Sequence, residues 1–307
     1  MNPPPHIHLP SVVWIAGCGF IGRKLAETLH ARGSTVVGLT HSVASAEALA
    51  TEAPFAVCAC DISSPESLAA LAATAPQPDA IVHCASSGRG GADQYEAVYF
   101  QGCANFLQAC PSAILLFTSS TSVYPQIAGE AVDESSPALP DRETGQILRR
   151  TEDLVTSHSG IVARLAGLYG PGRSVLLQRF LDGSARIEEG ESRYLNQVHR
   201  DDVVSALVAL LSHPGDASGQ IYNVADGEAL TQRECYEQLA AHFGTSVPPE
   251  GPRDLNRKRG WTHKRIVIDK LRALGWSPLY PSFLDAVRHD PELVPSIRAL
   301  TPGNLAM

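Results

Sequence analysis

Three glycines near the start of the chain are spaced as Gly17-x-Gly19-x-x-Gly22. They follow a continuous apolar run, Val12 to Ala16, which is too short for a helix and rich in β-forming residues. Residues 20–29 then mix apolar and polar side chains at helical spacing. The glycines are therefore predicted to lie on a strand-to-helix turn, and in that setting this spacing is typical of a dinucleotide-binding site.

Each residue of this turn has a predicted part in binding. Gly17 permits the tight turn, Gly19 lets a pyrophosphate approach the backbone, and Gly22 lets the helix pack close to the strand. Phe20 and Ile21 complete the turn. The free N–H groups and the positive end of the helix dipole would then face the phosphates.

The end of the second predicted strand, Thr35 to Leu39, bears on the choice of cofactor. NAD-selective sites place a carboxylate about 20 residues beyond the glycines, where it binds the ribose 2′-hydroxyl. Here the strand ends in Thr40, His41 and Ser42, with no carboxylate. We expect NADP or NAD, with a mild preference for NADP, because these side chains can donate to a 2′-phosphate. The alternative, that His41 is an ordinary surface histidine, stays open.

Other candidate cofactor contacts follow the third and fourth predicted strands. Asp61 and Ile62 close the strand Phe55 to Cys60, where the aspartate could accept from an adenine amine. Its alternative role is to cap the turn that leads to Ser64-Pro65-Glu66. Ala85 and Ser86 are small, so they would let the cofactor ribose and nicotinamide lie against the backbone.

The elements that must position these residues alternate regularly along the chain. Strands are expected at 12–16, 35–39, 55–60, 80–84, 114–118 and 161–165, with helices between them, the longest over 95–109 and 144–158. This alternation predicts an α/β fold with a doubly wound parallel sheet, the Rossmann fold. We expect a Rossmann domain over 1–170, to which about 199–226 return, and a smaller α/β substrate cap from 171–198 and 227–307.

Composition limits the classes of function. The 307 residues carry a net charge of −8 with scattered basic side chains, which argues against nucleic acid and anionic membranes as partners. No apolar run approaches the roughly 20 residues needed to span a bilayer, and Met1 to Pro10 lacks the pattern of a signal peptide. The seven cysteines form no C-x-x-C motif, so neither a zinc site nor a disulfide framework is expected. A cytoplasmic protein without a metal follows.

Several motifs occur together and in a consistent order. They are the glycine turn, Asp61-Ile62, the segment Ser119 to Tyr124, Tyr169-Gly170-Pro171-Gly172, His199-Arg200-Asp201-Asp202 and Tyr222 to Asp226. In these motifs the chain resembles the extended short-chain dehydrogenase/reductase family, the NAD-dependent epimerase/dehydratase group. The resemblance implies a Rossmann domain that binds NAD(P) and a C-terminal domain that usually recognises a nucleotide sugar.

The family's acid-base residues are only partly present. Its serine or threonine after the fifth strand corresponds to Ser120, but the positions of its Tyr-x-x-x-Lys pair hold Thr144 and Leu148. An alkyl hydroxyl is a far weaker acid than a phenol, and leucine can neither lower a neighbouring pKa nor bind the nicotinamide ribose. Arg149 lies about 100° around the helix and is a poor substitute. The sequence therefore predicts an atypical member of the family.

Two classes of function remain open. The first is an oxidoreductase acting on a nucleotide sugar or a small carbonyl compound, with Tyr124 as the leading acid and His199 as a weaker candidate. The second is a sensor or regulatory protein that binds NAD(P)H without turnover. Tyr124 could instead be a packed aromatic residue, His199 a helix cap, and Arg164 a structural ion-pair partner. The oligomeric state is left open, a homodimer included.

Overall fold

A seven-stranded parallel sheet forms the centre of the protein, whose computed structural model describes residues 9–88, 90–253 and 261–300. Residues 1–8, which hold most of the segment considered above as a possible signal peptide, lie outside the described residues. The strands of the sheet are β1 (Val12–Ala16), β2 (Thr35–Thr40), β3 (Ala56–Ala59), β4 (Ala80–His83), β5 (Ile114–Ser120), β7 (Ile161–Leu165) and β12 (Ile221–Val224). Their order is β12-β7-β5-β4-β1-β2-β3, and every neighbouring pair is parallel, which confirms the predicted doubly wound fold.

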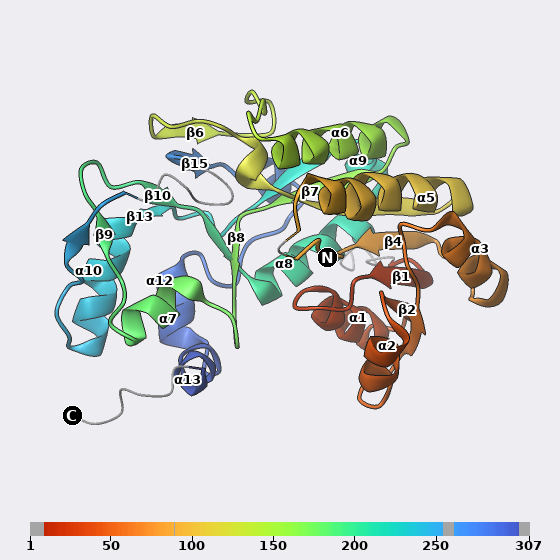
Figure 1. Cartoon of the computed structure of the whole chain (residues 1–307), viewed down its shortest axis with the longest axis horizontal. Helices are drawn as coiled ribbons and strands as arrows, with labels where there is room; N and C mark the ends of the chain where they lie inside the picture. The colour runs from red at the N-terminus through yellow and green to blue at the C-terminus, as the bar shows by residue number, and fades with distance from the viewer. Residues whose placement is uncertain (1–8, 89, 254–260, 301–307) are drawn as a thin grey trace, which may run out of the picture.

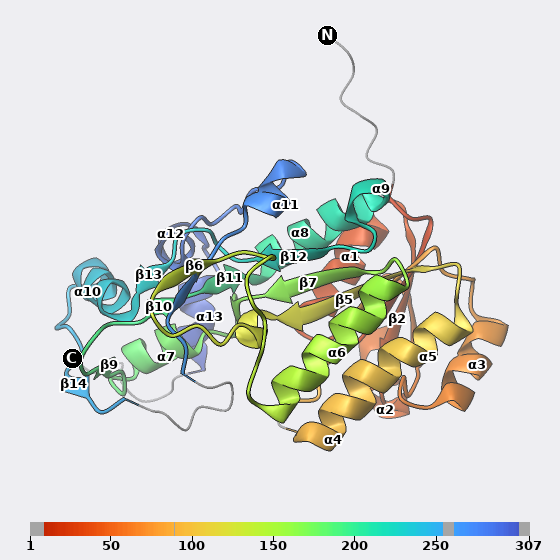
Figure 2. The same ribbon diagram turned by 90° about the horizontal axis from the view of Figure 1, so that it is seen from above.

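Helices cover both faces of this sheet, as Figures 1 and 2 show. One face carries α1 (Gly22–Ala31), α2 (Val43–Ala50) and α8 (Arg200–Ser212), and the short α9 (Pro214–Ala217) follows α8. The other face carries α3 (Pro65–Thr74), α5 (Gly102–Ala109) and α6 (Glu143–Ser157). The two layers explain why the apolar run of β1 is buried after Val12.

The strand order reverses between β1 and β4, because the chain passes from β3 at one edge back to the middle of the sheet. In open α/β sheets the crevice for a ligand lies at such a point, beyond the carboxyl ends of the strands. The glycine turn after β1 and the small residues after β4 both lie at this place in the fold.

The helix predicted over 95–109 is divided into α4 (Ala92–Tyr95), a π-helical segment η1 (Glu96–Gln101) and α5. Nε2 of the buried His83 lies 2.8 Å from the carbonyl oxygen of Val98. The Val98 carbonyl of the π-helical segment thus has a hydrogen-bond partner, His83, outside the helix. Periodicity alone does not reveal such a turn, because the π-helical segment shifts the face of the helix by only part of a turn.

The remaining strands form four short pairs beyond the carboxyl edge of the sheet. They are β6 (Glu130–Val132) with β15 (Lys264–Ile266), β8 (Gly167–Tyr169) with β11 (Gln197–His199), β9 (Ile187–Glu188) with β14 (Glu250–Gly251), and β10 (Tyr194–Leu195) with β13 (Leu230–Thr231). The 3₁₀ turn η2 (Thr121–Val123) follows β5.

A second, smaller apolar cluster lies apart from the core of the sheet. It is enclosed by α7 (Val175–Leu181), α10 (Gln232–Phe243), α12 (Phe283–His289) and α13 (Leu293–Ala299), which gather on the left of Figure 1. Ile266, Leu271 of α11 (Asp269–Ala273) and Trp276 pack instead into the core of the sheet. Part of the expected cap range 227–307 therefore contacts the Rossmann core directly.

Two further observations bear on the sequence expectations. All seven cysteines are free thiols. Within the described part of the chain, no helix combines the length and the apolar character that crossing a membrane requires.

Candidate functional site

The three glycines after β1 differ in the space around them. Gly17 has a φ of +89°, and a Cβ there would lie 2.4 Å from Cα of Ala85. A Cβ at Gly22 would lie 2.1 Å from the carbonyl oxygen of Gly17, whereas one at Gly19 would meet nothing within 4 Å. The outer glycines are therefore needed by the fold, and the middle one leaves open space at the start of α1.

The helix that follows presents its N-terminus to this space. No side-chain hydrogen bond caps α1 at Ile21, and its first turn contains no acidic residue. Arg173 and Arg200 place their guanidinium carbons 5.2 and 5.7 Å from the centre of the Phe20 ring, beside the turn. This arrangement suits an anion, and the residues present fit a dinucleotide pyrophosphate. The sequence did not assign either arginine to this turn, because both come from segments that are distant along the chain.

A small pocket, here called the inner pocket, lies next to the turn and has a volume of about 100 Å³. Its lining brings together the end of β4, the end of β5, α4, η1 and α6. The predicted residues Ile21, Ala85, Ser86 and Ser120 all line it. Ser120 sits where predicted, at the end of β5, and its Oγ accepts a hydrogen bond from the N–H of Ser122 at 3.2 Å.

The predicted adenine contacts lie at the ends of β2 and β3. The Asp61 carboxylate accepts from the N–H and the hydroxyl of Ser63, and these bonds lower the pKa of Asp61. Ile62 is buried against the core, and its carbonyl accepts from Asn105. Asp61 is thus ionised at neutral pH, and its bonds with Ser63 also fit the turn-capping role that the sequence left open.

The His41 side chain is 81% exposed, and its Nδ1 lies 3.8 Å from Oδ1 of Asp61. The fold thereby brings a carboxylate close to the position where the sequence shows none. The neighbouring hydroxyls are engaged locally, since Thr40 donates to the Ser42 carbonyl and Ser42 caps α2. The argument for NADP from Thr40 and Ser42 is weakened accordingly.

Tyr124, the leading acid in the sequence analysis, is not among the residues that line the inner pocket. Its side chain is fully buried, and its hydroxyl lies 2.9 Å from Oδ1 of Asn223 and from the Asp133 carbonyl oxygen. The hydroxyl also accepts from Nη1 of Arg164 at 2.7 Å. Burial raises the pKa of Tyr124, although Arg164 opposes the shift. These contacts fit the alternative of a packed aromatic residue, since the described linings of the inner and outer pockets do not include Tyr124.

The other two residues weighed in the sequence analysis are also buried. His199 is the N-cap of α8, where Nδ1 accepts from the N–H of Asp201 and Nε2 lies 3.0 Å from Oδ2 of Asp290. Desolvation lowers the pKa of His199. Arg164 pairs with the buried Glu152, as expected of a structural ion-pair partner. Neither residue lines the inner pocket.

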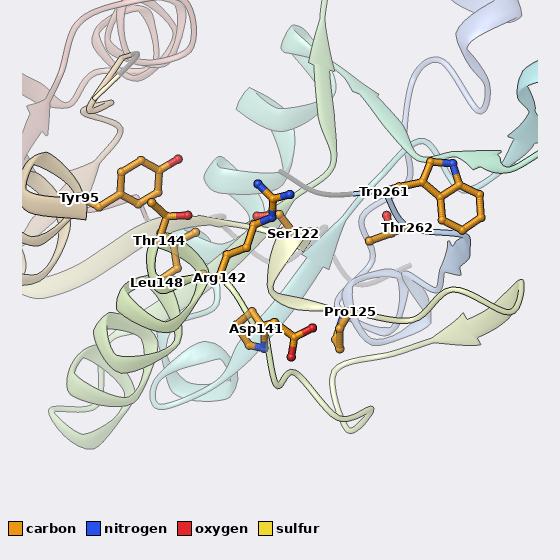
Figure 3. Close-up of a pocket in the computed structure, with 11 residues that line it drawn as sticks. Tyr95, Ser122, Pro125, Asp141, Arg142, Thr144, Leu148, Trp261 and Thr262 are labelled. Carbon is orange, nitrogen blue, oxygen red and sulfur yellow. The ribbon is translucent and has the colours of Figure 1, made fainter. Parts of the chain in front are cut away.

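A second pocket, here called the outer pocket, has a volume of about 120 Å³ and adjoins the inner one. The residues common to both linings are Tyr95, Ser122 and Leu148. Thr144 lines only the outer pocket, together with Arg142 and Trp261 among others (Figure 3). The positions of the family's tyrosine and lysine thus face the pockets, and no lysine is among the described residues that line them.

Two tyrosines of the inner pocket were not identified from the sequence. Tyr95 and Tyr99 lie four residues apart, on one face of the helical segment before α5, and their ring centroids are 4.9 Å apart. The Tyr99 hydroxyl accepts from the N–H of Ser87 at 3.2 Å. The i, i+4 spacing of two phenols after the fourth strand is the signal that could have found them.

No three histidine, cysteine, aspartate or glutamate side chains are grouped as metal ligands would be, within the part of the chain that the structure covers.

Comparisons with known proteins agree with this architecture. A family model described as the NAD dependent epimerase/dehydratase family matches residues 13–225. Protein YeeZ of Escherichia coli strain K12 is 32% identical over 88% of this chain and 96% of its own length. The dTDP-6-deoxy-L-talose 4-dehydrogenase (NAD(P)(+)) of Kitasatospora kifunensis is 30% identical over 89% of this chain and 92% of its own.

Among solved structures, the ADP-L-glycero-D-manno-heptose-6-epimerase of Helicobacter pylori superposes with a TM-score of 0.77. Its sequence identity is 21%, and the superposition covers 97% of this chain and all of that one. At this identity the likeness shows the fold alone, and it extends over the segments that were expected to form the cap.

Proposed function

The chain belongs to the NAD-dependent epimerase/dehydratase family, and from this premise we propose that it is an oxidoreductase that uses NAD or NADP. The observation that carries the proposal is a contrast among the glycines of the turn. A side chain at Gly17 or Gly22 would clash with the protein's own backbone, whereas the space beside Gly19 is empty. Open space at that one position is what a pyrophosphate requires.

The residues divide among the parts of the cofactor. Asp61 and Ile62 would hold the adenine, the turn with the N-terminus of α1 the pyrophosphate, and Ala85 and Ser86 the nicotinamide ribose. When bound, the nicotinamide supplies or accepts the hydride. Ser120, which lines the same inner pocket, would hold the substrate oxygen by a hydrogen bond.

The preference between NAD and NADP is proposed to be small. The exposed His41 can contact a 2′-phosphate, which favours NADP, but the ionised Asp61 beside it repels that phosphate. We retain the mild NADP preference as the expectation, because His41 is the more exposed of the two side chains. Replacing Asp61 by asparagine should then shift the preference further toward NADP.

The substrate is proposed to be a carbonyl compound or the corresponding alcohol, with a nucleotide sugar as the class that the dTDP-sugar dehydrogenase relative suggests. It would enter through the outer pocket, between α6 and the segment that holds Trp261. We propose the division into a Rossmann domain over 1–170, with 199–226, and a cap from 171–198 and 227–307. The second apolar cluster supports this division.

Calorimetry with NADH and NADPH, followed by a single-turnover assay, tests the proposal. The protein loaded with reduced cofactor is mixed with dTDP-4-keto sugars and with small aldehydes, and the absorbance of the dihydronicotinamide is followed. Binding with oxidation supports the oxidoreductase. Binding without oxidation by any compound would support the sensor instead, and flat titrations with both nucleotides would overturn cofactor binding itself.

A further inference from the structure

Tyr95 occupies the junction of the inner and outer pockets. It lines both, although only 8% of the residue is exposed. Ser122 and Leu148 share this position, but the first is an alkyl hydroxyl and the second is apolar. Tyr95 is therefore the phenol that borders the nicotinamide site and the outer pocket together.

Its place relative to α6 bears on the missing acid. The segment α4, which ends at Tyr95, packs against α6, where Thr144 and Leu148 stand in the positions of the family's tyrosine and lysine. Figure 3 shows the Tyr95 ring extending from its helix past Thr144, with its hydroxyl directed toward the side where Arg142 and Ser122 lie. A phenol thus reaches the same pocket from the opposite helix.

Several contacts hold this segment in place. The Tyr95 ring packs edge-on against Tyr99, with interplanar angle 79°. Glu96, the next residue, forms an ion pair with Arg150 of α6, and the Arg150 guanidinium lies 4.4 Å from the centre of the Phe100 ring. The π-helical turn begins at Glu96, and such turns occur frequently at functional sites. The ring itself therefore packs against Tyr99, and the ion pair and the Phe100 contact tie the following residues of the segment to α6.

We propose that Tyr95 is the catalytic acid of this protein and replaces the tyrosine that is absent at position 144; this inference rests on the proposed oxidoreductase function. In the reductive direction, the reduced nicotinamide that the glycine turn, Ala85 and Ser86 would hold would supply hydride to the carbonyl carbon of the substrate and would itself be oxidised. The π electron pair of the C=O bond moves to oxygen, and that oxygen takes the proton of Tyr95 Oη. The product is an alcohol, and the phenolate recovers a proton from water through the outer pocket.

The charges around Tyr95 fit this role. Arg142 and Asp141 line the outer pocket, Glu96 next to Tyr95 in the chain pairs with Arg150, and the Tyr99 ring contacts the Tyr95 ring. A guanidinium that faces the same pocket favours the phenolate that proton transfer leaves behind. Arg142 would thus serve part of the purpose of the family's lysine, from two positions before Thr144 rather than four after it.

The test compares the wild-type protein with Tyr95→Phe, which retains the ring and removes only the hydroxyl. Tyr222→Phe is the matched control, because its hydroxyl donates to the Asp216 carbonyl and Tyr222 is in neither pocket lining. With 4-nitrobenzaldehyde as the probe, the single-turnover rate of Tyr95→Phe should fall about 10²- to 10⁴-fold. The dissociation constant of Tyr95→Phe for the cofactor, measured by the same calorimetric titration, should stay within about twofold of the wild-type value.

A structural readout accompanies the rates. In a crystal of the wild-type protein with oxidised cofactor and 4-nitrobenzyl alcohol, the alcohol oxygen should lie about 3 Å from Tyr95 Oη. A Tyr95→Phe protein that turns over at the wild-type rate would overturn the proposal, and so would an alcohol bound away from Tyr95. Failure of the wild-type protein to bind cofactor would instead overturn the proposed function on which it rests.

Discussion

Arg164 Nη2 lies 2.7 Å from Oε2 of Glu152, and both side chains are almost entirely buried, at 2% and 0% exposure. Glu152 also accepts from the hydroxyl of Ser119, which lines the inner pocket. The pair thereby connects α6, β7 and the end of β5. An ion pair this deeply buried is costly to form, but its partial removal leaves an uncompensated charge in the core.

Glu152→Gln should therefore destabilise the protein by about 3–5 kcal/mol, because the Arg164 charge remains buried without its partner. The matched control is Glu27→Gln, which breaks the exposed Arg23–Glu27 pair on α1 and should cost about 0.5 kcal/mol or less. Urea unfolding monitored by circular dichroism measures both. Equal losses in the two variants would show that the buried pair does not stabilise the fold as described.

Tyr124→Phe separates the two roles considered for Tyr124. The variant loses the hydroxyl that Arg164 and Asn223 contact, so the free energy of unfolding should fall by about 1–3 kcal/mol. Hydride transfer should remain within about threefold of wild type, because the phenol is buried and Tyr124 lines neither pocket. A loss of turnover of about 100-fold without a loss of stability would restore Tyr124 as the acid.

Gly19→Ala tests the open space at the glycine turn. Nothing lies within 4 Å of the added Cβ, so the midpoint of thermal unfolding should stay within about 2 °C of wild type. The methyl group would occupy the approach of the pyrophosphate, so cofactor affinity should fall at least about tenfold. Gly215→Ala, which also meets nothing within 4 Å, is the control and should bind as wild type. Unchanged affinity in Gly19→Ala would place the pyrophosphate elsewhere.

The buried Lys264 should make the free energy of unfolding increase as the pH becomes alkaline. Its Nζ donates to the Tyr124 carbonyl at 2.8 Å, and burial, aided by Arg193, lowers the pKa of Lys264 from 10.5 to about 8. Between these values the unfolded chain binds more protons at this residue than the folded protein does, so its contribution to stability increases with pH. The gain over this range is about 3 kcal/mol.

Urea titrations at pH 7.5 and 10 measure this effect as the difference between wild type and Lys264→Met. The free energy of unfolding of Lys264→Met should change less between pH 7.5 and pH 10 than that of the wild type, because the variant lacks the amine that loses its proton. A difference as large as that of the wild type would show that another group is responsible.

The sequence alone determined the sheet, because its information is local. The apolar run from Val12 to Ala16, the glycine spacing and the strand-helix alternation each depend on residues close together in the chain, and they predicted β1 and the parallel direction of the strands. Ser120 lies at the end of its strand for the same reason. The departure from the family's pair at Thr144 and Leu148 is likewise readable from sequence.

Only the tertiary structure decided which groups meet at the site. Tyr124 follows its strand as predicted, but its hydroxyl bonds to Arg164 and Asn223, which come from later strands. Tyr95, in contrast, lines the pocket because α4 packs beside α6. Asp61 likewise approaches His41 only because β3 lies next to β2. The burial of a side chain and its contacts depend on packing between segments that are tens of residues apart. The spacing of residues within one segment does not show which distant segments will pack against it.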